Sequence, residues 1–409
     1  MDMTNESKVN RRADSLMLNN RFFTRPHPDI ELGYKRSILE YVLTFPKGGI
    51  NSDTGLIFVI TPFGDSPDSV YQAEKLRPFL AEKYNCIVAS VIYFGMDRSF
   101  NSVSFDYQFL DLLQAKYAIP YTEFLNENGS IKEDSFTILA SHLKMKGIRF
   151  LTESRPYMQT VYHQKGEYQS FGFLPALDCL VVLGDILKKY PINKKKIIAY
   201  GSSYGGYIAL LLGKFAPQTF SVIIDNSGYS RASLHNVCTK DFNTGSQIYN
   251  DGNVIISGVS EEPWTLVNEN DPCYFSDSCR SIRSLLEEKH RVASDTAYFI
   301  FHGDNDQICP TKDKEEVVKI LEKYNPIYFK KVTESDLDGV VFKNMNHGMD
   351  ASLRGLFERV YTLDNQNLLK NTESTDFENE NVYHFDCGNK IYQMSFSKDY
   401  QVKSQILDR

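Results

Sequence analysis

Short, uninterrupted apolar runs recur along the chain and are separated by segments with helical periodicity. The runs at 56–61, 86–93, 197–200 and 297–303 predict buried strands, because neither face of them is polar. The segment 171–190, ahead of the third run, predicts a helix. Strands that alternate with helices in this way favour an α/β fold with a mostly parallel, doubly wound sheet.

Three weaker segments extend the pattern. Alternating apolar and polar residues at 37–44 predict an edge strand, and the run 340–342 predicts a short strand late in the chain. The segment 66–85 predicts a helix in which Pro78 causes a kink or an early stop.

Two long stretches interrupt the alternation, at 96–168 and 228–295. The first is too long for a simple loop, and Ser130–Glu133 has the pattern of a capping box, so it predicts an insertion with its own helices. The second is rich in Asn, Asp, Ser and Gly, which predicts a rim or lid, and it contains Trp264 as an expected packing anchor.

The chain therefore divides into a polar N-terminal segment 1–30, a main domain 31–370 that contains both insertions, and a C-terminal extension 371–409. In the extension, two apolar stretches flank a glycine-containing turn at 386–390, which predicts a β-hairpin. Its open edge is a candidate for pairing with a strand of this chain or of a second copy, so a homo-oligomer is one expected partner state.

Composition and charge indicate where in the cell the protein is expected and which kinds of partner are not expected. No uncharged stretch approaches the roughly 20 residues of a membrane helix, and the polar first 20 residues lack the apolar core of a signal peptide. The seven cysteines are scattered and odd in number, as in a reduced protein, so we expect a cytoplasmic location. The formal charge of −7 argues against partnership with nucleic acid or an anionic membrane.

The segment Gly201–Gly206 carries the strongest chemical signal. It contains Gly-x-Ser-x-Gly between an apolar strand and a helix-like run, the pattern of a nucleophile elbow with Ser203 at its apex. Glycine at 201 and at 205 lets strand and helix approach closely and lets the serine adopt unusual backbone angles. We therefore expect Ser203 to be a nucleophile.

A serine nucleophile needs a histidine that takes its proton and an acid that orients the histidine. Asp306 lies in the turn after the buried strand 297–303, at the edge where parallel sheets gather catalytic groups. His347 lies on a loop after the run 340–342. A single loop histidine is more often satisfied by backbone groups, but the elbow and the Asp turn in this order favour a triad of Ser203, Asp306 and His347.

Other acids and histidines compete for these roles. Asp304 is expected to form the turn, whereas Asp225, at the end of the run 222–224, is an alternative acid that ranks below Asp306. The remaining histidines show no i, i+4 pairs and no adjacent cysteine pair, so neither a metal site nor a cofactor is expected.

An oxyanion also needs donors. One is expected from the backbone N–H of Tyr204, where the new helix begins. The second should come from the loop after the strand 56–61, where the amides of Phe63 and Gly64 both remain candidates and Pro62 has no N–H.

The order serine, aspartate, histidine and the turn His302–Asp306 resemble the α/β-hydrolase superfamily. The segments 200–209, 224–229 and 346–357 resemble a bacterial family of hydrolases often encoded near flagellin-glycosylation genes and, more distantly, the accessory-secretion protein that O-acetylates adhesin glycans. The resemblance implies an α/β-hydrolase fold and a small-molecule or glycan acyl ester as substrate.

These observations predict a serine hydrolase, either a carboxylesterase or deacylase or an acyltransferase, that forms an acyl-enzyme. One alternative is a peptidase that resembles the prolyl-oligopeptidase class, although the alternation that begins before residue 56 leaves no room for a propeller of four ~40-residue blades. The other is a non-catalytic scaffold in glycan modification, which the presence of all three triad residue types disfavours.

Overall fold

The computed structural model describes residues 20–96, 100–105, 107–152, 158–163, 166–242, 245–250, 253–259, 262–363, 369–370 and 372–409. The chain forms two compact units. The sheet domain is built from the segments up to 96, 171–232 and 277–409, and the insertion unit from 97–170 and 233–276. The segments of the insertion unit overlap the expected insertions 96–168 and 228–295, but residues 169–170 were not expected in it, and residues 96, 228–232 and 277–295 belong to the sheet domain.

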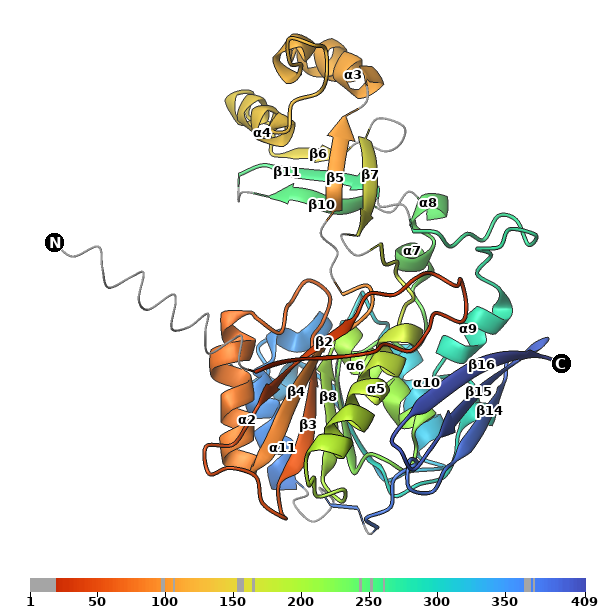
Figure 1. Cartoon of the computed structure of the whole chain (residues 1–409). Coiled ribbons are helices and arrows are strands. Elements are labelled where there is room, and N and C mark those ends of the chain that lie inside the picture. Colours follow the sequence, from red (N-terminus) through yellow and green to blue (C-terminus); the bar gives the residue numbers. More distant parts are fainter. Residues whose placement is uncertain are drawn as a thin grey trace. The chain divides into compact units, whose positions relative to one another are not determined.

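An eight-stranded sheet forms the centre of the sheet domain (Figure 1). Its strands are β1 (Arg21–Thr24), β2 (Leu39–Thr44), β3 (Gly55–Ile60), β4 (Cys86–Ile92), β8 (Ile197–Ser202), β9 (Val222–Asn226), β12 (Ala297–Gly303) and β13 (Ile327–Val332). Their spatial order is β1-β2-β4-β3-β8-β9-β12-β13. The strand β2 runs antiparallel to β1 and β4, and every other neighbouring pair is parallel. This is the strand order of the α/β-hydrolase fold, and the predicted fold class is confirmed.

Helices cover both faces of this sheet, which is why β3, β4 and β12 are buried almost throughout. They are the π-helical turn η1 (Tyr71–Leu76) that leads into α2 (Arg77–Tyr84), then α5 (Phe173–Lys189), α6 (Tyr204–Phe215), α10 (Thr311–Leu321) and α11 (Leu353–Leu363). A further helix, α9 (Asp277–Arg283), contacts α6, where the hydroxyl of Tyr207 donates to the carbonyl of Arg283. The apolar sides of α2 and α11 pack in one cluster with alternate residues of the strands, and α6 meets the opposite face at Tyr298. Among the described residues, no helix is long and apolar enough to cross a membrane.

The expected early stop at Pro78 is wrong, because α2 runs on to Tyr84. Pro78 lies in the first turn of α2, directly after the π-helical η1, and Leu76 and Arg77 at the junction both have helical backbone angles. A kink at Pro78 stays a prediction. The helix ends at Tyr84, followed by Asn85 in the left-handed conformation.

The ends of the sheet differ from the prediction. The segment 37–44 contains β2, which is not an edge strand, because β1 from the supposedly separate N-terminal segment pairs outside it. The run 340–342 is not a strand: the carboxylate of Asp338 accepts the amides of Val340, Val341 and Phe342 and holds them in a turn. The last strand of this sheet is β13. It lies at the edge and is half-exposed, so its sequence shows no continuous apolar run.

The C-terminal extension contains the predicted hairpin, from β14 (Val382–Asp386) and β15 (Lys390–Phe396), and one strand more. The added strand β16 (Val402–Asp408) completes a three-stranded antiparallel sheet. Its residues alternate between buried and exposed and include several charged ones, so no apolar run marks it in the sequence.

The insertion unit contains helices and small sheets. Its elements are β5 (Phe100–Phe105), α3 (Tyr107–Tyr117), η2 (Tyr121–Phe124), α4 (Ser135–Met145), β6 (Phe150–Thr152), β7 (Met158–His163), α7 (Leu234–Val237), α8 (Thr239–Phe242), β10 (Gly245–Asn250) and β11 (Ile255–Val259). The expected capping box at 130–133 is wrong, because α4 begins only at Ser135 and Ser130 bonds within a turn to Asn128. Trp264 is buried between the rings of Tyr168 and Phe275, as a packing anchor. A rim or lid role of 228–295 stays a prediction.

A buried ion pair joins segments from both ends of the chain within the sheet domain. The guanidinium of Arg283, on α9, donates to both carboxylate oxygens of Glu31 at 2.5 and 2.7 Å, and both side chains are almost wholly inaccessible. The hydroxyl of Tyr392, on β15, donates to the same carboxylate at 2.9 Å. Burial would lower the pKa of Arg283, but the adjacent Glu31 outweighs burial and raises it.

Replacing Glu31 with glutamine should therefore strongly destabilise the sheet domain. The change keeps the side-chain shape but leaves a buried guanidinium without a counter-charge, which costs about 3–5 kcal/mol. Urea unfolding of the full chain measures this loss. Asp313→Asn, which breaks the exposed pair with Arg231, is the control and should have little effect; equal losses in the two variants would contradict the role of the buried pair.

Candidate active site

The turn between β8 and α6 holds Ser203 in a rare backbone conformation. Its φ of 54° and ψ of −121° lie outside the regions that L-residues prefer. The turn is fixed from both sides, because the amide of Ser203 donates to the carbonyl of Asn226 at 2.7 Å and its carbonyl accepts the amide of Tyr207 at 3.0 Å. The hydroxyl therefore leaves the sheet at the carboxyl end of β8.

The two glycines of this turn are required by close backbone contacts. A Cβ on Gly201 would lie 2.1 Å from the carbonyl oxygen of Gly205, and a Cβ on Gly205 would lie 2.1 Å from the carbonyl oxygen of Ile60. The first turn of α6 thus rests directly on the backbone at the end of β3.

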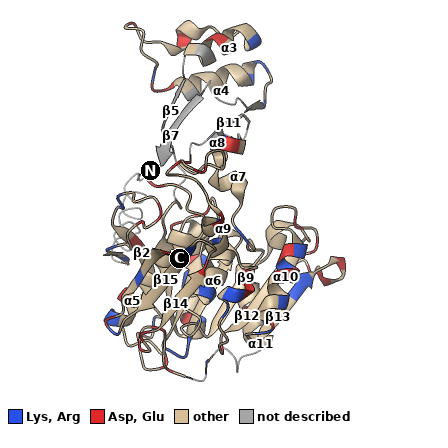
Figure 2. Cartoon of the chain, turned by 90° about the vertical axis from the view of Figure 1, so that its right-hand side faces the viewer, with Lys and Arg blue, Asp and Glu red and all other residues tan. Residues whose placement is uncertain are grey.

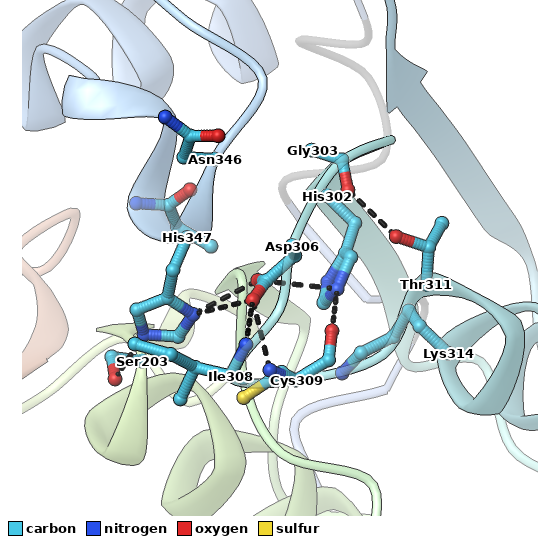
Figure 3. Close-up of polar contacts among 12 residues, drawn as sticks. Ser203, His302, Gly303, Asp306, Ile308, Cys309, Thr311, Lys314, Asn346 and His347 are labelled. Carbon is cyan, nitrogen blue, oxygen red and sulfur yellow. Dashed lines mark hydrogen bonds and ion pairs between the residues drawn. The ribbon is translucent and has the colours of Figure 1, made fainter.

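The structure brings Ser203, His347 and Asp306 together from three separate loops (Figure 3). Nε2 of His347 lies 2.7 Å from Oγ of Ser203. Nδ1 of His347 lies 2.8 Å from Oδ2 and 3.1 Å from Oδ1 of Asp306. The serine and the carboxylate therefore contact opposite nitrogens of one imidazole ring.

The carboxylate of Asp306 is kept ionised. Its Oδ1 also accepts the amides of Ile308 at 2.9 Å and Cys309 at 2.8 Å. Burial would raise the pKa of Asp306, but the hydrogen bonds from His347 and the Cys309 amide outweigh burial and lower it. An ionised carboxylate only accepts, so Nδ1 of His347 carries the proton and Nε2 is left to accept the serine hydroxyl.

A second imidazole lies on the other side of this carboxylate (Figure 3). Nε2 of His302 lies 2.7 Å from the carbonyl of Cys309 and 3.4 Å from Oδ2 of Asp306. Burial, and then the charge of Lys314, lower the pKa of His302, so this ring is neutral and Nε2 is its donor. In the sequence, His302 stands out only as the first residue of the turn 302–306, and its place between the strand and Asp306 is the one signal of this contact.

Asp225, the alternative acid, contacts other groups. Its Oδ2 accepts the ammonium of Lys314 at 2.7 Å, with both side chains fully buried, and its Oδ1 accepts the amide of Gly228 at 2.8 Å. Lys314 comes from α10, on which cationic and anionic residues are interspersed, blue and red in Figure 2. The structure thus brings Asp306, and not Asp225, to His347, which the sequence could not settle because Lys314 gave no signal.

The expected oxyanion donors come from adjacent segments. The ring of Phe63 stacks on the ring of Tyr204 with centroids 3.8 Å apart, which ties the loop after β3 to the start of α6. This loop turns at Gly64, with φ of 82°, and the amide of Asp65 donates to the carbonyl of Pro62 at 3.4 Å. The donor roles of Tyr204, Phe63 and Gly64 stay predictions.

Among the described residues, one group of side chains has metal-ligand spacing: Asp306, Cys309 and His347, with ligand atoms within 4.8 Å of one another. Nδ1 of His347 and both carboxylate oxygens already share hydrogen bonds. Burial and the charge of Asp306 raise the pKa of the Cys309 thiol, which disfavours the thiolate that a metal requires. The closeness of His347 to Asp306 is thus explained by their hydrogen bond, and that of Cys309 by the hydrogen bond from its amide to the same carboxylate.

Gly205→Ala should destabilise the protein. Alanine favours a helix by about 1 kcal/mol, but its methyl group would collide with the backbone carbonyl of Ile60, and such overpacking costs about 1–3 kcal/mol or more. The unfolding free energy, measured by urea unfolding, shows whether the change destabilises the protein as expected. In the control Gly48→Ala the methyl group meets open space, so a Gly205→Ala variant no less stable than this control would contradict the close approach.

The stabilising effect of Asp306 should depend on pH. Because its folded-state pKa lies below the ordinary value near 3.9, the ionised group stabilises the fold fully above about pH 4, and the effect is lost as the pH falls through the folded-state value. Unfolding free energies of wild type and Asp306→Asn should therefore differ near pH 6 and converge in acid. A gap that stays constant down to pH ~2 would show that the carboxylate is not held in this way.

The solved structures that this chain resembles include esterases and a peptidase. Est1E from Butyrivibrio proteoclasticus with ferulic acid bound is 13% identical, with 81% of this chain and 96% of that chain covered and a TM-score of 0.42. The native esterase Est2 from Thermogutta terrifontis is 11% identical, with 84% and 91% covered and a TM-score of 0.42. Acylaminoacyl peptidase from Pyrococcus horikoshii is 14% identical, with 89% and 44% covered and a TM-score of 0.42.

None of the curated proteins compared with the chain matches it. One family model does, and it spans residues 21–406, from β1 of the central sheet to β16 of the C-terminal sheet. The chain therefore belongs to the family described as "Protein of unknown function (DUF2920)".

Proposed function

We propose that the protein is a serine hydrolase or acyltransferase that works through an acyl-enzyme on Ser203. The observation that carries this proposal is the pair of contacts on one imidazole ring, with Oγ of Ser203 2.7 Å from Nε2 of His347 and the Asp306 carboxylate 2.8 Å from Nδ1. A hydroxyl on a strained turn, a base and an orienting acid are the three parts that acyl transfer needs.

In the first half of the reaction, Oγ of Ser203 attacks an ester carbonyl while Nε2 of His347 takes the hydroxyl proton. Asp306 stabilises the imidazolium that forms, and it is already ionised and held by two backbone amides before reaction. His347 then donates the proton to the leaving alcohol, which leaves the acyl group on the serine.

The oxyanion of each tetrahedral intermediate is assigned to the amide of Tyr204 and to that of Phe63 or Gly64. Support comes from the start of α6, where the first amides of a helix lack intrahelical acceptors, and from the ring stack that holds the Phe63 loop against it. In the second half, His347 activates either water, which makes the protein an esterase, or a sugar hydroxyl, which makes it a transferase.

The proposed substrate is an O-acyl group on a glycan or a small sugar. This assignment rests on the sequence resemblance to the hydrolases near flagellin-glycosylation genes and to the glycan O-acetylating protein. Acetylated sugars and short p-nitrophenyl esters, each with and without an acceptor sugar, separate deacylation from transfer by the product formed.

Ser203→Ala should lower kcat for p-nitrophenyl acetate by about 10³-fold or more, because the acyl-enzyme can no longer form. His347→Ala and Asp306→Asn should also be impaired, and the combined variants should lose little beyond the single serine variant, since the three residues act as a unit. A fluorophosphonate probe should label wild type and fail to label Ser203→Ala.

Ser335→Ala is the control for labelling, because Ser335 is exposed and its hydroxyl hydrogen-bonds with that of its near neighbour Thr333. Undiminished labelling of Ser203→Ala would overturn the nucleophile assignment. If wild type neither takes up the probe nor cleaves any small ester, the scaffold alternative is favoured. Faster cleavage of aminoacyl amides than of acetyl esters would favour the peptidase.

A further inference from the structure

A polar pocket of about 950 Å³ lies in the sheet domain. Three segments far apart in the sequence form its wall: the N-terminal stretch 24–36, the second half of α5, and residues 395–405 of the C-terminal sheet. Ser203, Asp306 and His347 are not among its lining residues, so it is separate from the candidate active site.

The wall carries four exposed cationic side chains that form no ion pair within the described part of the chain. They are Arg25, Lys35, Lys188 and Lys403. Each of the three wall segments contributes at least one of them. Two of them have an acid in their vicinity: the pKa of Asp399 is lowered by the hydrogen bond from Ser397 and, to a lesser extent, by the charges of Lys188 and Lys403.

The acids of the wall are already bonded. The carboxylate of Asp29 accepts the amides of Glu31, Leu32 and Tyr34. That of Asp185 accepts the hydroxyl of Tyr41 at 2.5 Å and the ammonium of Lys189 at 2.7 Å.

The fifth cation of the wall, Arg36, pairs with the buried Asp178. The lining holds five cationic residues and only two acids, Asp29 and Asp185, so the wall is positively charged overall, in a protein whose formal net charge is −7.

A buried hydroxyl in the same wall lacks a partner. Ser404 is only 9% exposed, and its Oγ has no hydrogen bond to any described group. The backbone beside it is fixed, because the amide of Ser404 donates to Nε2 of His27 at 2.8 Å, while Nδ1 of His27 donates to the carbonyl of Pro28 at 2.7 Å. An unsatisfied buried hydroxyl in a polar pocket calls for a bonding partner.

We propose that this pocket binds a small sugar derivative that carries at least two phosphate or carboxylate groups. Cations on three different wall segments match more than one anionic group, and the cavity falls within the size range of small-molecule sites. Ser404, Gln401 and Gln405 offer hydrogen bonds to sugar hydroxyls, and the ring of Tyr34, 40% exposed, offers a flat apolar face.

Calorimetric titration of the full chain tests this proposal with four probes: ATP, trigalacturonate, pyrophosphate and the neutral sugar maltotriose. At least one of the first two should bind with a dissociation constant below about 1 mM. ATP binding points to a phosphorylated sugar, and trigalacturonate binding to a carboxylated one. Pyrophosphate should bind more weakly than the better of these, because it lacks the sugar contacts.

Lys188→Ser combined with Lys403→Ser should weaken binding of that probe by at least about tenfold, and Ser404→Ala should weaken it as well. The matched control, Lys312→Ser with Lys319→Ser, removes the same charge from exposed positions on α10 and should bind as wild type does. Ser203→Ala should also bind normally, so failure of the hydrolase proposal and failure of this one are distinguishable.

Three results would overturn the proposal. They are the absence of binding below about 1 mM by both anionic sugar derivatives, an equal loss of affinity in the α10 control, and maltotriose binding as tightly as the charged probes. Since the four lysines replaced in the double variant and in its control are all exposed, a folding defect does not obscure the comparison between them.

Discussion

The direct contact between the start of α6 and the end of β3 is the constraint on which the candidate site depends. No side chain separates the two backbones, since the carbonyl of Ile60 occupies the place of a methyl group on Gly205. This contact fixes the height of the elbow above the sheet and the position of Ser203 relative to β9, whose Asn226 carbonyl binds its amide. The ring stack of Phe63 on Tyr204 lies at the same place, so Ser203 and the proposed oxyanion donors are positioned by the same backbone contact.

Two groups of ionisable side chains lie next to the candidate site: Asp306 with its two histidines, and the pair of Asp225 and Lys314. Asp306 lies between His347 and the neutral His302, and is held by backbone amides. Asp225 and Lys314, both fully buried, form an ion pair. This pair joins the Gly228 loop to α10, while burial and then the charge of Lys314 lower the pKa of His302 and keep it uncharged. The proposed triad thus faces a wall with no net charge of its own, which leaves Asp306 as the dominant anion beside His347.

The sequence predicted the centre of the fold better than its margins, for physical reasons. Strands covered on both faces, such as β3 and β12, are continuous apolar runs and could be located closely. Edge and half-exposed strands, such as β1, β13 and β16, carry mixed residues and were missed. The run at 340–342 was misread because a turn organised by one carboxylate looks, in sequence, like a short buried strand.

For the site, motif and chain order identified the residues that meet at Ser203, because the elbow needs glycine at fixed positions. They could not reveal His302 or Lys314 as neighbours, since these contacts depend on how β12, β9 and α10 pack. The polar pocket was also beyond sequence reasoning, because its walls come from segments that share no local pattern.

The bond between Glu31 and Tyr392 spans 361 positions and has a consequence for biosynthesis. A ribosome makes the segment around Glu31 before it makes the residues that bind this carboxylate. Arg283 follows 252 residues later and can pair with Glu31 first, whereas Tyr392, which donates the hydrogen bond, follows 361 residues after Glu31. A chain truncated before β15 would therefore retain the ion pair partners but lack the hydroxyl that Tyr392 donates to Glu31.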